Sequence, residues 1–208
     1  MTKRVPSRKI RTTIKNQDLV EKRHNQIFEG ARRLFAKKGY HVVGLRELSN
    51  EIGISLGNLY NYIKTKDDIL YIIHQKAAEM VMQATKQKTN KVASPVTKLE
   101  KMMESELRTI DKYQDLILLI YQESHALRKA SLHALLRSEE VHLQRFQKVL
   151  EEGMALGVFK SMNSIMLANI IKMMIDCWAL KRWSLRGRVS LEVMKRGILG
   201  LVEKGIIN

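Results

Sequence analysis

The sequence predicts an all-α fold of about nine helices. Among its 208 residues only 2 are Pro and 11 are Gly, while good helix formers such as Leu, Lys and Glu are frequent. Apolar residues recur at spacings of three and four over most of the chain, as they do on one face of a helix. No segment shows the strict alternation expected of a strand. Together these observations favour helices throughout.

The composition indicates a folded and strongly basic protein. Hydrophobic residues make up 45% and charged residues 28% of the chain, enough to build a core, and the net charge is +16. Such a charge indicates a polyanionic partner: nucleic acid, an acidic membrane surface or a phosphorylated ligand. Residues 1–75 contain 15 Lys and Arg against 7 Asp and Glu, a net +8, and the later residues, with 22 and 14, carry the other +8. Both halves therefore need an explanation.

The sequence gives no indication of export or membrane insertion. Cys177 is the only cysteine, so no disulfide can form within one chain, which suits a reducing cytoplasm. The N-terminus lacks the apolar run of a signal peptide. The most apolar later stretch, 165–180, contains Asn169, Lys172 and Asp176 and is shorter than the ~20 residues of a spanning helix. We expect a cytoplasmic protein with no cofactor, metal or membrane partner.

Residues 1–20 are predicted to form a flexible basic arm, because they lack an apolar pattern. The arm is either a disordered tail or a segment that tracks phosphates or enters a minor groove, and the two descriptions are compatible. Its basic residues are Lys3, Arg4, Arg8, Lys9, Arg11 and Lys15.

The apolar period predicts the helices in order. The first spans 20–38, and Gly39 can end it in a left-handed conformation. Three more are predicted at 45–52, 56–62 and 66–88, with Thr65 as a candidate N-cap of the last. Pro95 suits the first position of a following helix. The remaining helices are predicted at 96–113, 114–127, 131–156, 163–183 and 191–204.

Residues 43–62 have the pattern of a helix-turn-helix that reads the major groove of DNA. Gly53-Ile54-Ser55 joins two short helices, because Gly allows the chain to reverse and Ser55 can cap the second helix. That helix would expose small and polar groups that suit base edges and phosphates, and the start of the next helix would add backbone N–H groups. These residues are Leu56, Gly57, Asn58, Tyr60, Asn61 and Tyr62, with Lys64 and Lys66 beyond them. In the plainer alternative the two tyrosines only pack and the lysines are solvated.

A longer pattern surrounds this turn. It consists of Ile27-Phe28-Glu29-Gly30-Ala31, Leu34-Phe35, Gly39-Tyr40, Leu48 and the specific segment Gly53-Ile54-Ser55-Leu56-Gly57-Asn58-Leu59-Tyr60-Asn61-Tyr62-Ile63-Lys64-Thr65-Lys66-Asp67-Asp68-Ile69-Leu70. The pattern resembles the TetR/AcrR family of bacterial transcriptional regulators, strongly over residues 21–80 and diffusely afterwards.

The resemblance implies a dimer with two domains in each chain. Residues 21–80 would form an N-terminal three-helix HTH DNA-binding domain, and residues 81–208 a C-terminal helical ligand-binding and dimerisation domain. The chain would be a repressor that a small effector releases from its operator. The resemblance places at the DNA Arg46, Ser55, Leu56, Gly57, Asn58, Tyr60, Asn61, Tyr62 and Lys66. Gly44 departs from the family's capping Thr, which puts a phosphate contact in doubt, and Ile63 replaces a Phe.

The last two helices are predicted to form a four-helix interface between two copies of the chain. The 163–183 helix is apolar over most of its circumference, so one side can face the core and the other a partner. Glycines inside the last helix each cost about 1 kcal/mol, which close helix–helix approach would offset. The predicted interface residues are Ile171, Ile175, Gly197, Gly200 and Leu201.

The C-terminal half is also predicted to bind an amphipathic anion, for example a fatty acyl-CoA. Met adapts to flexible apolar ligands, and Arg and Lys bind phosphates. The plainer alternatives are Met as core filling, a simple Lys172–Asp176 pair and a solvated basic surface. The predicted pocket residues are Met102, Tyr121, Met174, Asp176, Trp178 and Arg182. Further basic residues are Arg128, Lys129, Arg137, Arg145, Lys181, Arg186 and Arg188.

We do not expect an enzyme. The six His form no His-Glu-x-x-His pair, and no Gly-rich phosphate loop is present. The other alternative is a basic helical protein that binds a membrane surface or lipid without operator specificity. The predicted partners are double-stranded operator DNA, a second copy of the chain and a small effector.

Overall fold

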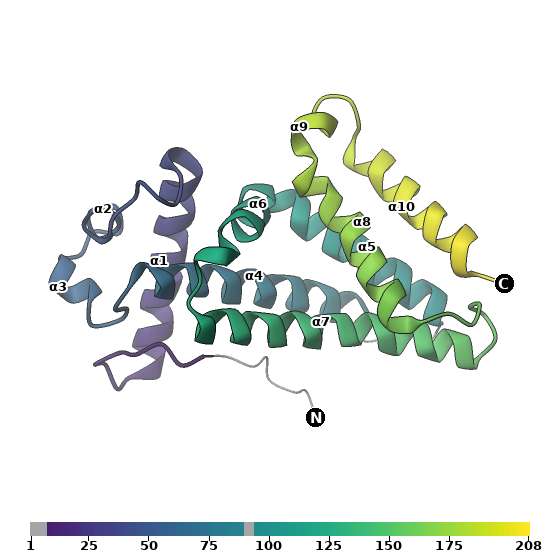
Figure 1. Ribbon diagram of the computed structural model, residues 1–208, viewed down its shortest axis with the longest axis horizontal. Helices are drawn as coiled ribbons and strands as arrows, with labels where there is room; N and C mark the ends of the chain where they lie inside the picture. Colours follow the sequence, from purple (N-terminus) through teal and green to yellow (C-terminus); the bar gives the residue numbers. More distant parts are fainter. Residues whose placement is uncertain (1–7, 90–93) are drawn as a thin grey trace. The chain divides into compact units, whose positions relative to one another are not determined.

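The computed structural model describes residues 8–89 and 94–208, with the backbone alone for 86–89. Its regular structure is helical, apart from an isolated antiparallel bridge between Phe159 and Ile207 (Figure 1). The elements are α1 (Gln17–Lys38), α2 (Leu45–Glu51), α3 (Leu56–Leu59), α4 (Lys66–Thr89), α5 (Pro95–Lys112), α6 (Gln114–Glu123), η1 (Ser124–Ala126), α7 (Lys129–Ala155), α8 (Ser164–Leu180), α9 (Arg182–Leu185) and α10 (Leu191–Ile206). The predicted all-α class is confirmed.

Three predicted helices end earlier than expected. The helix predicted at 163–183 is interrupted at Lys181, whose φ of −104° and ψ of 18° lie outside the helical region, so α9 is a separate short helix. The helix predicted at 114–127 finishes as the 3-10 turn η1, and α3 ends at Leu59. The other predicted ends lie within three residues of the observed ones.

The chain divides into two compact units. The first unit consists of Met1–Ala77 and Leu118–Ser138, and the second of Ala78–Ile117 and Glu139–Asn208. A segment from the middle of the chain therefore completes the N-terminal unit, although the boundary predicted near residue 80 assigns it to the other domain. The first unit contains 19 Lys and Arg against 8 Asp and Glu, a net charge of +11, and the second unit carries the remaining +5. A net +3 of the +8 carried by the later sequence thus belongs to the first unit.

In the first unit, α1 packs closely on α2. A Cβ at Gly30 would overlap the side chain of Ile52, so only glycine permits this approach. Gly39, with a φ of 82°, ends α1 as predicted, and its N–H donates to the carbonyl of Phe35 at 2.8 Å. The buried residues of α1 are Val20, Ile27, Phe28, Gly30, Ala31, Leu34 and Phe35.

Residues 8–16 lie against the first unit and do not form the predicted free arm. Ile10 is only 6% exposed, and the Thr12 hydroxyl and the Thr13 N–H both donate to the carbonyl of Asn61, at 2.7 and 3.0 Å. Residues 17–20 already belong to α1. The physical reason is that one apolar side chain and a few hydrogen bonds suffice to hold a short segment, without a periodic apolar pattern. Residues 1–7 of the predicted arm lie outside the described residues.

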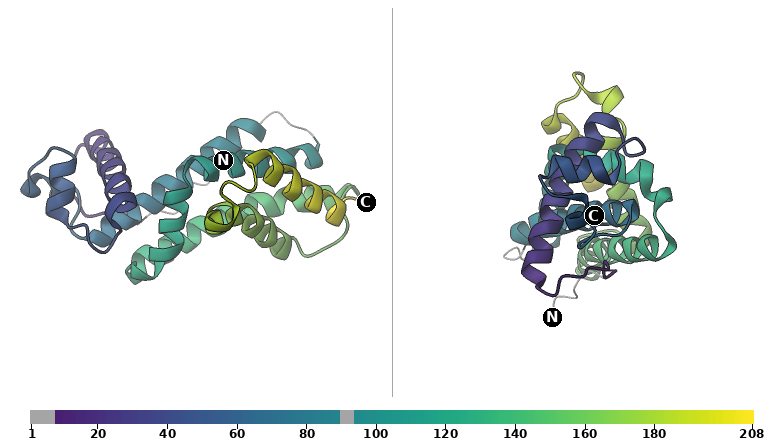
Figure 2. Two further views of the ribbon diagram at one scale, coloured as in Figure 1. Left: turned by 90° about the horizontal axis from the view of Figure 1, so that it is seen from above. Right: turned by 90° about the vertical axis from the view of Figure 1, so that its left-hand side faces the viewer.

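The core of the second unit is formed by α5, α7, α8 and α10. Phe146, Leu150, Ile171 and Ile175 are at most 1% exposed. Gly153 allows the Phe159 ring to lie against α7, because a Cβ there would overlap the ring. Figures 1 and 2 show α10 running alongside α8. Within the described ranges, no helix has both the length and the apolar character to cross a membrane.

Candidate nucleic-acid interface and effector cavities

A sharp turn presents α3 on the outside of the first unit. Gly53 has a φ of +70°, which glycine adopts without a steric penalty, and Ser55 Oγ accepts the N–H of Asn58 at 3.1 Å. Leu48 of α2 and Leu59 of α3 are both 0% exposed, so these two side chains fix the helices to the core of the first unit. The structure therefore contains the predicted helix-turn-helix.

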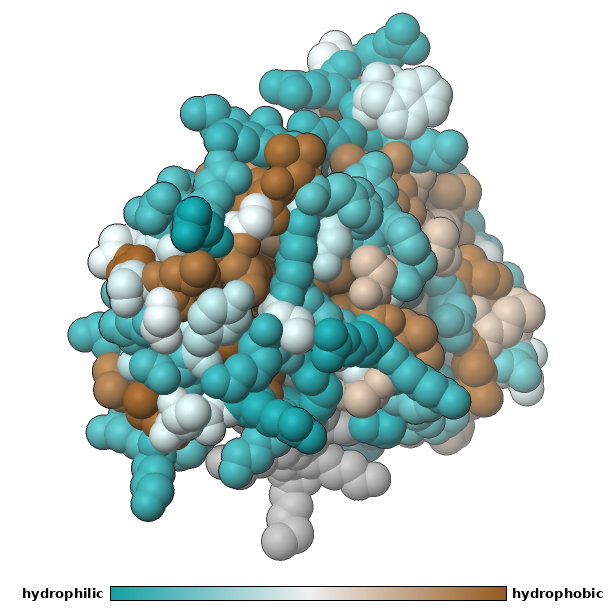
Figure 3. All heavy atoms as spheres, turned by 60° about the vertical axis from the view of Figure 1, so that its left-hand side comes forward, coloured by the Kyte–Doolittle hydropathy of each residue, from teal (hydrophilic) through white to brown (hydrophobic). Residues whose placement is uncertain are grey.

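Most of the predicted DNA contacts lie on the outer face of this motif. Tyr60 is 40% exposed. The exposed members of the set are Arg46, Ser55, Gly57, Tyr60 and Lys64, and the half-buried ones are Leu56, Asn58, Asn61 and Lys66. Figure 3, which brings the side of the molecule with α2 and α3 forward, shows hydrophilic side chains over much of this face with apolar patches between them.

Tyr62 is a buried residue of the first unit, so the prediction that it is exposed at the DNA is wrong. It is 4% exposed, its ring lies 5.3 Å from the Arg23 guanidinium, and its carbonyl lies 3.1 Å from Nε2 of His24. The physical reason is that α3 ends at Leu59, and the following turn directs Tyr62 into the core beside Ile63, which is 0% exposed. Tyr60 and Tyr62 therefore have different roles.

The N–H groups before α4, which were expected to bind phosphate, have an acceptor within the chain. The Asp68 carboxylate accepts the N–H groups of Lys64 and Thr65 at 2.8 and 3.0 Å, and it forms an ion pair with Arg8. The Thr65 hydroxyl also donates to this carboxylate, at 3.3 Å, so in this contact it is a donor and not the accepting cap that was predicted. Burial raises the pKa of Asp68, but these hydrogen bonds outweigh burial, and the pKa lies below its ordinary value.

Two further positions bear on the phosphate contacts. Gly44 leaves α2 without a side-chain cap, as its departure from the family pattern suggests. Lys66 donates to the carbonyl of His41 at 3.1 Å and lies 4.4 Å from the centre of the Tyr40 ring. Burial lowers the pKa of Lys66. A phosphate contact by Lys66 would therefore replace contacts that it makes within the chain.

An apolar groove of about 740 Å³ lies along α8, α9 and α10 of the second unit. Exposed apolar side chains line it, among them Met173 at 53% and Leu201 at 68% exposure. Of the predicted interface residues, Gly197 and Leu201 line the groove and Gly200 is half-buried. Ile171 and Ile175 are buried in the unit's own core, at 1% and 0% exposure, so their assignment to an interface is wrong.

The six predicted pocket residues do not come together in one cavity. Met102 is core filling at 2% exposure, and Tyr121 belongs to the first unit, where it is 45% exposed. Met174 lines the apolar groove, whereas Trp178 and Arg182 line a separate polar cavity. Side chains from distant helices cannot be assigned to a common cavity from helical periodicity alone, which explains the error.

The polar cavity has a volume of about 400 Å³ and lies between the end of α5 and the α8–α9–α10 region. Trp178 and Asp111 both line it, and Nε1 of Trp178 donates to Asp111 Oδ1 at 2.7 Å. Arg182 pairs with Asp115 at the rim. The other lining residues are Lys112, Gln114, Leu185, Arg186, Gly187, Val189 and Leu191. The cavity thus offers both charged groups and an aromatic surface.

A buried network of charges joins α5, α7 and α8. Glu106, 0% exposed, lies 3.0 Å from Nε2 of His142 and 3.4 Å from Nζ of Lys172, and Lys172 also pairs with Asp176. Burial alone would raise the pKa of Glu106, but the two cations lower it to about 2. Asp176 is thus a partner of Lys172, as the plainer alternative predicts. Sequence reasoning overlooked Glu106, although it interrupts an apolar helical row of Leu99, Met102, Met103 and Ile110.

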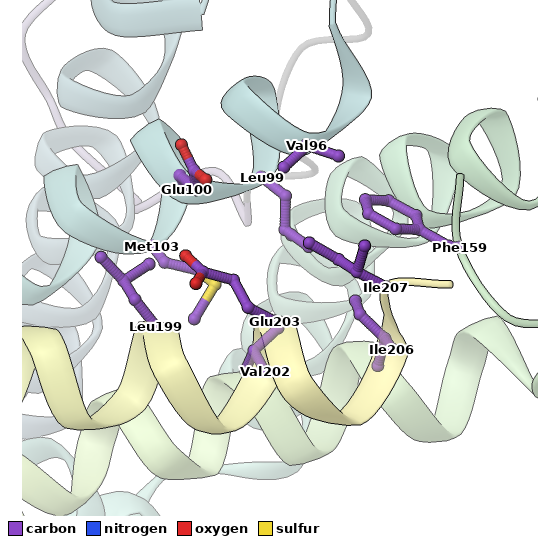
Figure 4. Close-up of a pocket in the computed structure, with 10 residues that line it drawn as sticks. All are labelled: Val96, Leu99, Glu100, Met103, Phe159, Leu199, Val202, Glu203, Ile206 and Ile207. Atoms are coloured by element: carbon purple, nitrogen blue, oxygen red, sulfur yellow. The ribbon is translucent and has the colours of Figure 1, made fainter.

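A third cavity, between α5 and α10, is too small for an effector. Its volume is about 10 Å³, little more than a water site. Figure 4 shows Glu100 and Glu203 near its apolar walls. Burial and the charge of Glu203 raise the pKa of Glu100. The groove and the polar cavity are therefore the better candidates for binding.

Both halves of the chain match models of known protein families. Residues 27–71 match the family of bacterial regulatory proteins, tetR family, and residues 92–206 match the tetracyclin repressor-like C-terminal domain. The HTH-type transcriptional regulator HbdR of Aromatoleum sp. (strain CIB) is 28% identical over 196 residues, which cover 93% of this chain and 85% of HbdR. The fatty acid metabolism regulator protein of Bacillus subtilis (strain 168) is 21% identical over 194 residues, 89% and 96% of the two chains. The crystal structure of AibR in complex with isovaleryl coenzyme A and operator DNA shares the fold, with a TM-score of 0.74 at 18% identity over 86% of this chain and 97% of AibR.

Proposed function

Because this chain belongs to the tetR family of bacterial regulatory proteins, it is a DNA-binding transcriptional regulator, and we propose that it is a repressor that a small effector releases from its operator. The observation that carries the proposal is the outer face of α3 and of the turn after it, which presents Asn58, Tyr60 and Asn61 on a unit with a net charge of +11. Amide and hydroxyl groups suit base edges, and the positive charge attracts the DNA backbone. A regulator of this kind acts in the cytoplasm, where the operator is.

Each subunit inserts α3 into a major groove, and a dimer spans two half-sites. Half-sites read by such dimers are about one helical turn (~34–36 Å) apart, or a multiple of it. The apolar groove along α8 and α10 supports a second copy of the chain as its occupant, because exposed Met173 and Leu201 would be covered by the same face of the partner. Obligate interfaces are apolar in this way.

The proposed effector is an amphipathic anion of the acyl-CoA class. AibR was crystallised with isovaleryl coenzyme A, and a ligand of this class combines phosphates with an apolar tail. In the present chain Lys112, Arg182 and Arg186 at the polar cavity offer cations for the phosphates. Leu185 and Val189 line both that cavity and the apolar groove, so they offer an apolar surface for the start of the tail at the side of the cavity nearest the groove.

Release requires coupling between the effector and the DNA-binding face. α4 contributes residues to both units, and it begins directly behind the recognition segment. A movement of α4 on effector binding would change the separation of the two α3 helices in a dimer. A coupling of ~1–3 kcal/mol would be enough for a switch.

The DNA-binding proposal is tested by selecting duplexes from a random-sequence pool with the purified chain. We expect a palindromic site bound with strong salt dependence. Weak association that ignores sequence, together with binding to anionic vesicles, would favour the lipid-binding alternative instead. The effector proposal is tested by thermal shift with acyl-CoAs of several chain lengths. We expect stabilisation that Arg186→Gln reduces and Lys101→Gln does not, and an absence of stabilisation at every chain length would refute it.

A further inference from the structure

We propose that the docked segment of residues 8–16 is a second DNA-contact surface, with Lys9, Arg11 and Lys15 on the phosphate backbone beside the half-site that α3 reads. The inference rests on the proposed DNA-binding function and adds to it a surface outside the helix-turn-helix. It assigns a role to charges that the recognition motif leaves unexplained.

The side chains of this segment alternate between the protein and the solvent. From residue 8 to residue 15, even-numbered positions face the first unit and odd-numbered positions face outward. The inward set, buried or half-buried, is Arg8, Ile10, Thr12 and Ile14, and the exposed set is Lys9, Arg11, Thr13 and Lys15. The exposed edge of the docked segment therefore carries three positive charges, those of Lys9, Arg11 and Lys15.

The inward side chains hold the segment in place. Ile10 is 6% exposed, and the backbone N–H of Arg8 donates to the Tyr71 hydroxyl at 2.5 Å. The guanidinium of Arg8 lies 4.9 Å from the centre of the Tyr71 ring and pairs with Asp68. The positive charge of Arg8 is thus neutralised within the chain, which distinguishes it from its exposed neighbours.

No described residue neutralises the three outward cations in this way. Among the residues that the structure describes, none pairs with the side-chain cation of Lys9, Arg11 or Lys15; Gln17 Nε2 donates to the backbone carbonyl of Lys15 alone, at 3.3 Å. Because the backbone that carries these cations is docked, contact with DNA costs less backbone entropy than it would for a free tail. These are properties of a surface that binds a polyanion through its backbone.

The segment is also continuous with the recognition motif. The hydroxyl of Thr13 lies 3.0 Å from Oδ1 of Asn61, and the Thr13 N–H donates to the Asn61 carbonyl at 3.0 Å. Asn61 follows α3 and belongs to the predicted DNA contacts. Both surfaces lie within the first unit, where the segment bends back before α1 begins (Figure 1). A duplex that reaches Asn61 therefore comes close to the cationic edge.

The experiment uses the full chain and a duplex that the wild type has selected from a random-sequence pool. Each phosphate contact contributes roughly 0.9 to the slope of log K against log salt, which corresponds to about eightfold in affinity at 0.1 M salt. We expect Lys9→Gln/Arg11→Gln/Lys15→Gln to bind at least about tenfold more weakly and with a smaller salt slope. The matched control Lys101→Gln/Lys148→Gln/Lys204→Gln removes three exposed charges from the second unit and should retain the wild-type slope.

A variant that keeps the charges separates a contact role from a structural one. Lys9→Arg/Arg11→Lys/Lys15→Arg should restore both affinity and slope, and all variants should melt at the wild-type temperature, since the docked side is unchanged. A neutral triple variant with the affinity and salt slope of its control would overturn the inference. A wild-type chain that selects no duplex would overturn the proposed function itself, and this outcome is distinct because it is seen before any variant is made.

Discussion

The carboxylate of Asp67 accepts the hydroxyl of Ser131 at 2.8 Å, and Asp67 also accepts the backbone N–H of Arg128 at 2.6 Å. Asp67 lies in the first turn of α4, and Ser131 lies near the start of α7. The two side chains are 6% and 0% exposed. This buried pair therefore ties the start of α4 to residues 118–138, the part of the first unit that comes from the middle of the chain.

Asp67→Ala is expected to destabilise the protein by about 1–3 kcal/mol, because it leaves the buried Ser131 hydroxyl and the Arg128 N–H without their acceptor. Urea unfolding followed by circular dichroism measures the change. Asp18→Ala is the matched control, since Asp18 is an exposed acid in the first turn of α1 and its loss should cost less than about 0.5 kcal/mol. Equal effects of the two substitutions would contradict the importance of the buried pair.

The two tyrosines after α3 should behave in opposite ways. Tyr60→Ala removes an exposed contact, so operator affinity should fall by about 1–3 kcal/mol with little loss of stability. Tyr62→Ala empties a core position, so the free energy of unfolding should fall by about 3 kcal/mol or more. Anisotropy titrations and urea unfolding give the two quantities. The assignment is wrong if Tyr60→Ala destabilises the fold as much as Tyr62→Ala.

His74 should make the first unit sensitive to acid. It is 2% exposed, and burial lowers its pKa to about 4. A histidine with a lowered pKa stabilises the fold above its unfolded pKa of about 6.5, and this contribution is lost as pH falls from there toward 4. The loss is about 2 kcal/mol between pH 7 and pH 5.

The measurement is urea unfolding of His74→Leu and the wild type at both pH values. The substitution should remove most of this pH dependence, while His133→Gln, at an exposed position, should keep it. An unchanged dependence in His74→Leu would show that another group is responsible.

His142 should titrate in the opposite direction. Burial alone would lower its pKa, but the carboxylate of Glu106, with a smaller effect of Glu139, raises it above the ordinary value. The stabilising contribution is therefore present below about pH 6.5 and is lost as pH rises through the pKa of the folded state. In Glu106→Gln the carboxylate charge is absent, and the pKa of His142 should fall below that of the wild type.

Proton NMR of the histidine rings follows this titration directly. Glu140→Gln, on an exposed part of α7, is the control and should leave the midpoint of His142 unchanged. If His142 titrates at the same pH in Glu106→Gln and in the wild type, the 3.0 Å contact does not set its pKa.

The apolar groove predicts the effect of charge on assembly. Leu201→Glu and Met173→Glu, at positions 68% and 53% exposed, would place unpaired charges in the proposed interface and weaken dimerisation on the order of a hundredfold. Leu136→Glu is the control, because Leu136 is 55% exposed but belongs to the first unit and does not line the groove. Native mass spectrometry over a concentration series distinguishes the species. A dimer that survives both substitutions would exclude the groove as its interface.

The helices and the turn were predictable because local signals determine them. Helical periodicity gave most boundaries to within three residues, and Gly53 and Ser55 marked the turn with the φ and the cap that they adopt in the structure. The burial of Tyr62 was not predictable from spacing alone, because it depends on where α3 ends. The helix ends and the turn are determined by residues that are close in sequence. The side of the chain on which Tyr62 lies is determined by the turn that follows Leu59.

The interface and pocket residues depend on contacts between distant segments. On α8, which is apolar nearly all round, periodicity does not tell whether Ile171 or Met173 faces the unit's own core; the structure buries the former and exposes the latter. The pairing of Glu106 with His142, 36 residues apart, likewise has no local signal beyond a charged residue in an apolar row. Only the packing of the helices decides such positions.

The first unit is closed by residues 118–138, which are made long after α1, α2 and α3. During synthesis the recognition motif therefore leaves the ribosome before Ser131 exists to bind Asp67, and this unit completes its fold only when the start of α7 has emerged. The same topology limits recombination between relatives. A hybrid chain joined at residue 80 would take Asp67 from one parent and its partners Arg128 and Ser131 from the other. A DNA-binding unit that is exchanged between relatives therefore has to include residues 118–138 together with the N-terminal segment.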